Sequence, residues 1–404
     1  MRVLCSTTPM DGVFGPFIPL GRALAAGGEE VVVASGANLR SRVQENGLEF
    51  VEAGLPAMDG VRGAFADPEV AAAPAGDVIA FPAAMFGAVH PGAKLPVLRE
   101  LAAAQPFELV IHPPVDLSGP LLAAELGLPS VCYGFGQPLD PTLVAAMAAR
   151  VRPLWEAAGL EPEPHGGIYR GRYLDPRPPG LGGGAVEAAL GSGPIRPEVP
   201  GEENSALPDW AATLGARPVV YLSLGTVPLF NQPEKFAPLL AGLGGKELDV
   251  ILTVGDLNDP AALGELAPTV HVERWLPLAA VLPHCEAVIC HGGTGTTLAA
   301  LVAGLPLVLV PQGADQFDNA RACERAGAAK VLLPAQVTAE AVRDAVRDVL
   351  SAGSSYRRAA RALAGEIAAM PPAAQVAREL GPDAPGCGAH RRMPRAGLEP
   401  APPD

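Results

Sequence analysis

The start of the chain alternates short apolar runs with amphipathic stretches. The run RVLCST (residues 2–7) predicts a buried strand, and IPLGRALAAGG predicts a helix with Leu20, Ala23 and Leu24 on one face. A second apolar run, EVVVAS (residues 30–35), is rich in β-branched residues and predicts another strand. This strand–helix–strand order is typical of the beginning of a doubly wound α/β domain with a parallel sheet.

The remainder of the first half continues the alternation and then loses it. ELVIHPP and PSVCYGF predict buried strands, and GPLLAAELG predicts the helix between them. Residues 160–210 are rich in proline, glycine and acidic side chains, so we expect this segment to add no packed core of its own. We therefore place the link between two domains near residues 198–212.

The second half restarts the pattern and predicts a second complete α/β domain. Strands are predicted in RPVVYLSLGT, DVILTVG, TVHVERW, AVICHGG, PLVLVPQ and KVLLP, and helices in residues 236–243, TTLAALVAGL, DNARACERAGAA and residues 338–350. The predicted domains are residues 1–205 and 206–381, with the last helical segments crossing back to the first domain. Residues 382–404 are proline-rich without apolar periodicity, which predicts a disordered tail.

Composition and charge narrow the class of partner. The net charge of −14 argues against nucleic acids and anionic membranes, because both attract cationic surfaces. Small-molecule partners are therefore expected. The chain begins with a predicted strand instead of a signal peptide, and no stretch reaches about 18 uninterrupted apolar residues, so we expect a cytoplasmic protein. The six cysteines lack CxxC spacing and no Asp-x-Asp cluster occurs, so no metal site is predicted.

The segment HGGTGTT, which begins at His291, follows a predicted strand and leads directly into a predicted helix. Glycines allow a ligand close to the backbone, and free amides at a helix start favour an anion such as a diphosphate. A tight strand-to-helix turn without a ligand is the alternative. A second turn of this kind, SLGT (residues 223–226), follows the first strand of the same domain and favours the diphosphate. The candidate contacts in HGGTGTT are Gly292, Gly293, Thr294, Gly295, Thr296 and Thr297.

Polar and aromatic residues flank this turn. Asp315 and Gln316, after the strand PLVLVPQ, should lie at the same sheet edge and could bind sugar hydroxyls. The alternative is capping of the next helix, for which Asp318 or Asn319 is better suited. Trp275 could stack on a base or belong to the core.

These motifs resemble the donor-binding half of the GT-B glycosyltransferases that decorate bacterial natural products, relatives of the UDP-glycosyltransferases. The resemblance rests on YLSLGT and on RWLPLAAVLPHCEAVICHGGTGTTLAALVAGLPLVLVPQGADQFDNA, and it fails beyond Gly381. It implies two Rossmann-like domains that face a cleft, an inverting transfer, and no cofactor besides a nucleoside-diphosphate sugar as co-substrate. It further implies pyrophosphate contacts from Ser223, Thr226, His291, Gly293, Thr294, Gly295 and Thr296, base contacts from Trp275 and Leu276, and sugar contacts from Asp315 and Gln316.

One position of the resemblance bears on the nucleotide. Plant relatives carry a ribose-binding glutamate in the helix after the glycine turn, and Ala299 stands at that position here. Without the glutamate, no carboxylate oxygens accept hydrogen bonds from the ribose hydroxyls. This loss matters least for a donor whose ribose lacks the 2′-hydroxyl. We therefore hypothesise a dTDP-linked, deoxygenated sugar.

The catalytic base is where the chain departs from the family pattern. Inverting members carry a base histidine in the first turn, where this chain has Val13, and Pro113 stands where an orienting aspartate often follows His112. Asp11, His112 or Asp116 could replace the base, although Asp11 could also cap a helix and His112 could be a strand-end residue. Alternatively, the acceptor is acidic enough to need little help from a base. The third possibility is that the chain binds donor without transferring a sugar, or that it works only with a partner protein.

The acceptor side is predicted only in outline. Aromatic and methionine side chains in the loops of the first domain suit a flat, hydrophobic acceptor such as a polyketide or an aromatic aglycone, unless they are core residues. His90 is expected to be a surface loop histidine. A nucleotide-sugar epimerase of the same fold and a homodimeric assembly also remain open at this point. The candidate acceptor contacts are Phe65, Phe81, Met85, Phe86 and Phe135.

Overall fold

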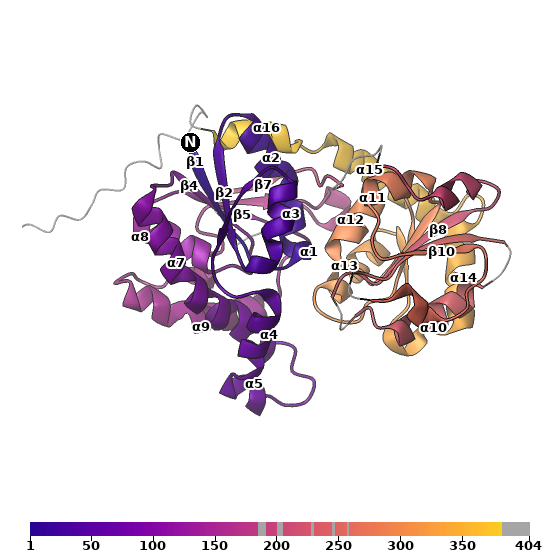
Figure 1. The fold of residues 1–404 in the computed structure, drawn as a ribbon, viewed down its shortest axis with the longest axis horizontal. Coiled ribbons are helices and arrows are strands. Elements are labelled where there is room, and N and C mark those ends of the chain that lie inside the picture. The colour runs from indigo at the N-terminus through magenta and orange to yellow at the C-terminus, as the bar shows by residue number, and fades with distance from the viewer. Residues whose placement is uncertain (185–190, 200–204, 228–229, 245–246, 257, 382–404) are drawn as a thin grey trace, which may run out of the picture.

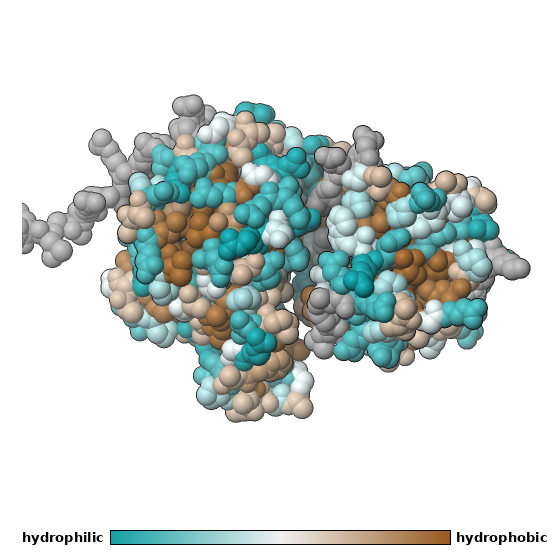
Figure 2. Space-filling view, in the orientation of Figure 1, coloured by the Kyte–Doolittle hydropathy of each residue, from teal (hydrophilic) through white to brown (hydrophobic). Residues whose placement is uncertain are grey.

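The structure is a computed structural model that describes residues 1–184, 191–199, 205–227, 230–244, 247–256 and 258–381. Two lobes lie side by side, each built around a parallel sheet covered by helices (Figure 1). In the space-filling view, a crevice separates the lobes (Figure 2). The predicted α/β class with two Rossmann-like domains is confirmed.

The first lobe contains a seven-stranded parallel sheet with the order β3-β2-β1-β4-β5-β6-β7. Its central strands are apolar runs because helices cover both faces of the sheet. The strands are β1 (Arg2–Ser6), β2 (Glu30–Ser35), β3 (Glu49–Glu52), β4 (Leu109–His112), β5 (Ser130–Tyr133), β6 (Arg172–Asp175) and β7 (Gly191–Pro194).

Helices surround this sheet, and a group of short ones extends away from it. The segment from α4 to α6 projects from the lobe beside the crevice (Figure 1). The helices are α1 (Asp11–Phe14), α2 (Ile18–Ala26), α3 (Arg40–Glu45), α4 (Ala57–Phe65), α5 (Pro68–Ala72), α6 (Ala80–Ala84), α7 (His90–Ala104), α8 (Ser118–Leu126) and α9 (Pro141–Ala157).

Strands β6 and β7 correct the expectation for residues 160–210. Tyr173 and Leu174 of β6 are buried in the two cores that lie on opposite faces of the first sheet. The turn residues around this short strand hide its alternation in the sequence, so a segment that resembles a linker completes the sheet of the first lobe.

The second lobe contains a six-stranded parallel sheet with the order β10-β9-β8-β11-β12-β13. The strands are β8 (Val219–Ser223), β9 (Asp249–Thr253), β10 (Val270–Glu273), β11 (Ala287–Cys290), β12 (Leu307–Leu309) and β13 (Ala329–Val331). The helices are α10 (Pro233–Leu243), α11 (Leu278–Val281), α12 (Thr294–Val302), α13 (Gln316–Arg325) and α14 (Ala339–Leu350).

The last two helices, α15 (Ser355–Ala369) and α16 (Ala373–Leu380), lead back to the first lobe, as predicted (Figure 1). Val376 and Ala377 of α16 join the core that contains α2 and β1. Glu379 forms a 2.8 Å ion pair with Arg172 of β6. The predicted boundary at residue 205 falls between β7 and β8, and the predicted tail, residues 382–404, lies outside the described residues.

Five of the six cysteines are buried and free, and Cys387 lies outside the described residues. Within the described ranges, no helix has the length and apolarity needed to cross a membrane. The same ranges contain no group of three or more His, Cys, Asp or Glu side chains arranged to hold a metal ion.

Candidate active site

The two glycine turns of the second lobe lie next to each other. Strands β8 and β11 are parallel neighbours, and Ser223 pairs in register with Cys290, so SLGT and HGGTGTT leave the sheet side by side. The imidazole of His291 fills the space between them. A Cβ atom at Gly225 would lie 2.6 Å from this ring, and one at Gly293 would lie 2.3 Å from it. Both positions therefore require glycine.

The start of α12 presents unpaired backbone amides. Gly293 is the N-cap, and the first helical hydrogen bond runs from the Thr297 amide to the Gly293 carbonyl. The amides of residues 294–296 thus precede the helical ladder and are free for an anion. Gly295 and Thr226 are exposed, whereas the side chain of Ser223 accepts a 3.3 Å hydrogen bond from the Gly225 amide.

His291 is an uncharged member of this site. Burial lowers its pKa to about 4, and a hydrogen-bonding contribution involving the Ser223 backbone only partly opposes this. A neutral imidazole supplies shape and one hydrogen-bond donor instead of positive charge. An anion at this site would therefore be held by the amides of the two turns and not by a charge on His291.

Asp315 is linked to the glycine turn by a hydrogen-bond network. Its Oδ2 accepts hydrogen bonds from Thr294 Oγ1 and from Asn319 Nδ2, both at 2.9 Å, and Asn319 also donates to the Gly292 carbonyl at 2.9 Å. The pKa of Asp315 is raised, because burial outweighs the opposing effect of the hydrogen bonds from Thr294 and Asn319. Helix α13 begins at Gln316, and Asp315 is its N-cap residue but makes no side-chain capping hydrogen bond. Asp318 and Asn319 lie inside the helix and do not cap it.

Gln316 supports the loop after β12. Its Oε1 accepts hydrogen bonds from the Gln312 amide at 2.8 Å and from the Gly313 amide at 3.2 Å. Ala314 in this loop has a φ of 52°, a conformation that is costly outside glycine and clusters at functional sites. The side chain of Gln316 is buried, so its oxygen serves the loop that presents Asp315.

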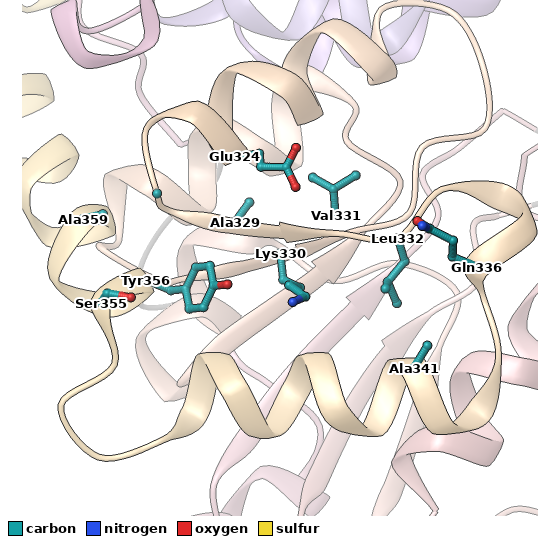
Figure 3. Close-up of a pocket in the computed structure, with 11 residues that line it drawn as sticks. Glu324, Ala329, Lys330, Val331, Leu332, Gln336, Ala341, Ser355, Tyr356 and Ala359 are labelled. Atoms are coloured by element: carbon teal, nitrogen blue, oxygen red, sulfur yellow. The ribbon is translucent and has the colours of Figure 1, made fainter.

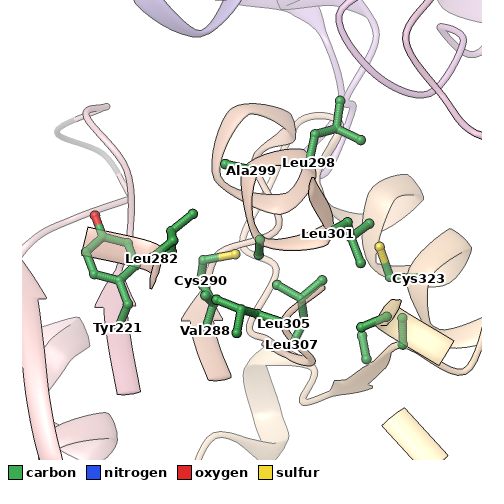
Figure 4. Close-up of a cluster of buried hydrophobic side chains, with 14 of the residues drawn as sticks. Tyr221, Leu282, Val288, Cys290, Leu298, Ala299, Leu301, Leu305, Leu307 and Cys323 are labelled. Carbon is green, nitrogen blue, oxygen red and sulfur yellow. The ribbon is translucent and has the colours of Figure 1, made fainter. Parts of the chain in front are cut away.

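Trp275 and Leu276, the predicted base contacts, differ in their exposure. Trp275 is 50% exposed, so it is available for stacking and is not a core residue. Leu276 packs in the same buried cluster as Leu298 and Ala299 of α12. Figure 4 shows Ala299 and Leu298 at the end of this cluster, among apolar neighbours. The methyl group of Ala299 offers no acceptor to a ribose hydroxyl.

The two lobes meet at the carboxyl ends of their sheets. Gly136, three residues after β5, lies against Thr294, because a Cβ atom at Gly136 would be 2.2 Å from Thr294 Oγ1. The start of α12 therefore faces the first lobe. A ligand held on this helix start would lie at the crevice between the lobes.

In the first lobe, both carboxylate oxygens of Asp116 are hydrogen-bonded. Its Oδ2 meets Lys94 Nζ at 2.5 Å and Ser6 Oγ at 3.1 Å. Its Oδ1 accepts from the amides of Ser118 at 3.0 Å and Gly119 at 3.2 Å. Burial alone would raise the pKa of Asp116, but Lys94, together with His112 and the Gly119 amide, lowers it on balance. Such a carboxylate is a weak base.

His112 and His90 are also enclosed. His112 is fully buried at the end of β4, and its Nδ1 lies 3.1 Å from the Pro113 carbonyl. His90 is 2% exposed at the start of α7, so the expectation of a surface histidine was wrong. Burial lowers the pKa of each to about 4, and the charge of Lys94 contributes for His90.

Asp11 differs from these groups because it is exposed at the beginning of α1. Its side chain makes no helix-capping hydrogen bond, so the capping alternative does not hold. The surrounding protein raises its pKa by desolvation, Arg42 opposes this, and Asp256 of the second lobe adds to it. Asp11 is thus an accessible carboxylate that experiences charges from both sides of the crevice.

The predicted acceptor residues fall into two groups. Phe65 and Phe81 pair with ring centroids 4.7 Å apart, and Phe65 is 65% exposed. Met85 is buried, with Phe81 and Phe86 packed against its small cluster between α4 and α6. Phe135 is half-buried and directly precedes Gly136, at the contact between the lobes. Met85 is therefore a core residue, and the others remain candidates.

A groove of about 770 Å³ lies elsewhere, along the outer edge of β13. Figure 3 shows Ala329 and Val331 on one side of this strand and Lys330 on the other. Strand β13 is the last strand in the sheet order, and the lining of the groove includes none of the glycine-turn residues. We assign the site to the glycine turns, where the amides and polar side chains converge.

The sequence alone did not indicate three residues that shape the site. Lys94 lies in an apolar helix, where a buried partner for its charge could be found only in three dimensions. Gly136 resembles any loop glycine, and Asn319 was considered only as a helix cap. A lysine among apolar helix residues was the one signal available, because such a charge is rarely buried without a partner.

Comparison with known proteins agrees with this geometry. Residues 237–381 match the family described as Erythromycin biosynthesis protein CIII-like, C-terminal domain. The elloramycin glycosyltransferase of Streptomyces olivaceus is 33% identical over 400 residues, which cover 94% of this chain and 97% of the relative.

Solved structures give the same result. The glycosyltransferase SnogD from Streptomyces nogalater has a TM-score of 0.75 and 29% identity, with 94% of this chain and 98% of that chain covered. The spinosyn rhamnosyltransferase SpnG complexed with thymidine diphosphate has a TM-score of 0.77 and 27% identity, with 94% and 100% covered. The chain belongs to the GT-B glycosyltransferases of bacterial natural-product biosynthesis.

Proposed function

We propose that this glycosyltransferase moves a deoxygenated sugar from dTDP to a hydrophobic natural-product acceptor, such as a polyketide or phenolic aglycone, with inversion and without a bound metal. The observation that carries the proposal is the pairing of two glycine turns around His291, with the free amides of α12 directed at the other lobe.

The amides of the two turns would bind the diphosphate and stabilise the charge that develops as it leaves. In many transferases a cation does this work, but fixed amide dipoles in a crevice can replace it. The complex of SpnG with thymidine diphosphate supports a nucleotide of this kind in the related fold.

Ala299 supports dTDP as the nucleotide. A ribose 2′-hydroxyl beside its buried methyl group would lose hydrogen bonds to water without a replacement from this side chain, and such a loss costs about 1–3 kcal/mol. Deoxyribose has no such group to satisfy. The sugar would meet Asp315, whose Oδ1 is not used by the Thr294 and Asn319 hydrogen bonds.

Asp11 is the best-supported base of the three candidates. It is accessible and its pKa is raised, whereas Asp116 is held by Lys94 and His112 is buried. In the proposed step, Asp11 takes the acceptor proton while the acceptor oxygen attacks the anomeric carbon. The bond from that carbon to the diphosphate oxygen breaks, and dTDP leaves on the opposite face.

A transfer assay tests this function. The protein is incubated with a dTDP-deoxysugar and a panel of phenols and aliphatic alcohols, with and without EDTA, and products are identified by mass spectrometry and NMR. We expect a glycoside of inverted anomeric configuration that forms equally in EDTA. Altered donor released without acceptor would indicate an epimerase, and bound dTDP without any product would indicate a donor-binding auxiliary protein. Either result would overturn the proposal.

A further inference from the structure

Lys94 is a buried charged residue of the first lobe, next to Asp116. Its side chain projects from α7 and is 1% exposed, as is that of Asp116. A buried ammonium is stable only when opposite charge and hydrogen-bond acceptors surround it. Lys94 Nζ contacts Asp116 Oδ2 and the Thr7 carbonyl, each at 2.5 Å.

The Thr7 carbonyl belongs to the turn that leads from β1 to Asp11. Ser35 Oγ donates to the same carbonyl at 2.8 Å, and the Thr7 hydroxyl meets the Tyr133 hydroxyl at 2.9 Å. Further along, Asn38 Nδ2 donates to the Pro9 carbonyl at 2.9 Å. Only Met10 separates Pro9 from Asp11. The path of the turn, and with it the place of Asp11, is thus set by side chains from several elements.

Lys94 is the only charged group among these contacts to the turn. Charge-assisted hydrogen bonds are about twice as strong as neutral ones. The ammonium also joins three elements at once, because Thr7 follows β1, Asp116 precedes α8, and Lys94 belongs to α7.

We propose that Lys94 is a positioning residue for transfer: through the Thr7 carbonyl it fixes the turn that presents Asp11, while Asp116 holds the ammonium in place. This inference rests on the proposed function for its catalytic consequence. Its structural consequence, an ordered turn at residues 7–11, does not depend on that function.

The test compares Lys94→Met with the double variant Lys94→Met/Asp116→Asn. The single variant leaves Asp116 without its counter-ion, so its melting temperature should fall. The double variant removes that unpaired charge, so much of the lost melting temperature should return. In both variants the Thr7 carbonyl loses its charged donor and keeps only the neutral Ser35 hydroxyl. We therefore expect kcat to stay at least about tenfold below wild type, because small misplacements near reacting groups are costly. The KM for donor should stay within about twofold.

A second ion pair on the same helix provides a matched control. Arg99 of α7 pairs with Glu125 of α8, with its Nε 3.0 Å from Oε2, and has no contact with the β1 turn. Arg99→Met and Arg99→Met/Glu125→Gln should keep the wild-type kcat. If the Lys94 double variant recovers kcat together with stability, or if Lys94→Met folds with the wild-type kcat, the inference is overturned.

Hydrogen exchange separates this inference from the proposed function. In both Lys94 variants, peptides that cover residues 7–14 should exchange faster, while peptides from α12 should not change. Unchanged exchange in residues 7–14 refutes the positioning role. Faster exchange in a protein whose wild type transfers no sugar retains the positioning role and rejects the proposed function instead.

Discussion

Gly136 of the first lobe lies against the side chain of Thr294 in the second, with no room for a methyl group between them. Thr294 is also the first residue of α12 and a partner of Asp315. The contact between the lobes therefore coincides with the predicted diphosphate site. The position of the first lobe should therefore affect transfer.

We expect Gly136→Ala to lower kcat/KM for transfer by about tenfold or more, because the added methyl group displaces one lobe and misaligns acceptor and donor. Binding of dTDP should change little, since the second lobe supplies those amides. Steady-state kinetics and nucleotide titration measure both effects. Gly92→Ala is the control, because its methyl group would meet nothing within 4 Å. If the two variants behave alike, the lobe contact has no role in transfer.

Asp11→Asn should reduce kcat by about 10²–10⁴-fold with little effect on donor binding, as expected for loss of a general base. The base acts only when ionised, so kcat of the wild type should fall as pH decreases through its raised pKa, above the ordinary value of 3.8. Asp256→Asn removes a repulsion that raises this pKa and should move the acidic limb to lower pH. A kcat that does not respond to Asp11→Asn would leave acceptor acidity as the explanation.

The second lobe could be predicted from the sequence in more detail than the first. Its glycine turns follow apolar strands, so the placement of His291 and Thr294 at one sheet edge follows from local pattern and parallel topology. The partners of Asp315 could not be predicted, because Asn319 reaches Gly292 only through packing of α13.

The first lobe shows where local pattern fails. His90 and Lys94 are buried because α7 packs against the first lobe, with Leu95 and Leu98 in its core, and the sequence of a single helix does not determine that position. For the same reason Asp116 could be considered a base until Lys94 was found beside it.

The free energy of unfolding should decrease under mildly acidic conditions. The pKa values of His90, His112 and His291 are lowered to about 4, so the unfolded chain binds more protons than the folded one as pH falls from 6.5 toward 4. The stability contributed by the neutral imidazoles is complete above pH 6.5 and is lost through this window. Melting temperatures measured across the window should therefore fall.

His90→Phe tests this assignment, because neither ring nitrogen of His90 has a hydrogen-bond partner. The variant should show a shallower decrease of melting temperature with acidification than wild type. His284→Phe, at an exposed position, should keep the wild-type slope. An identical slope for His90→Phe would show that His90 does not contribute to the pH dependence.

Comparing dUDP with UDP separates the effect of the ribose 2′-hydroxyl on binding from the effect of the nucleobase. The two differ only in the 2′-hydroxyl, which would lie unsatisfied beside Ala299. We expect dUDP to bind about fivefold or more tightly than UDP, consistent with the cost of an unpaired buried hydroxyl. Competition against a bound thymidine nucleotide provides the measurement. Tighter binding of UDP would place a ribose acceptor elsewhere in the crevice.

Calorimetric titration of the wild-type protein with dTDP in buffer that contains EDTA tests most directly whether the glycine-turn amides hold a nucleoside diphosphate. We predict saturable binding of one dTDP per chain, unaffected by the chelator. An absence of binding heat at several temperatures, or binding that appears only when a divalent metal is added, would contradict this account.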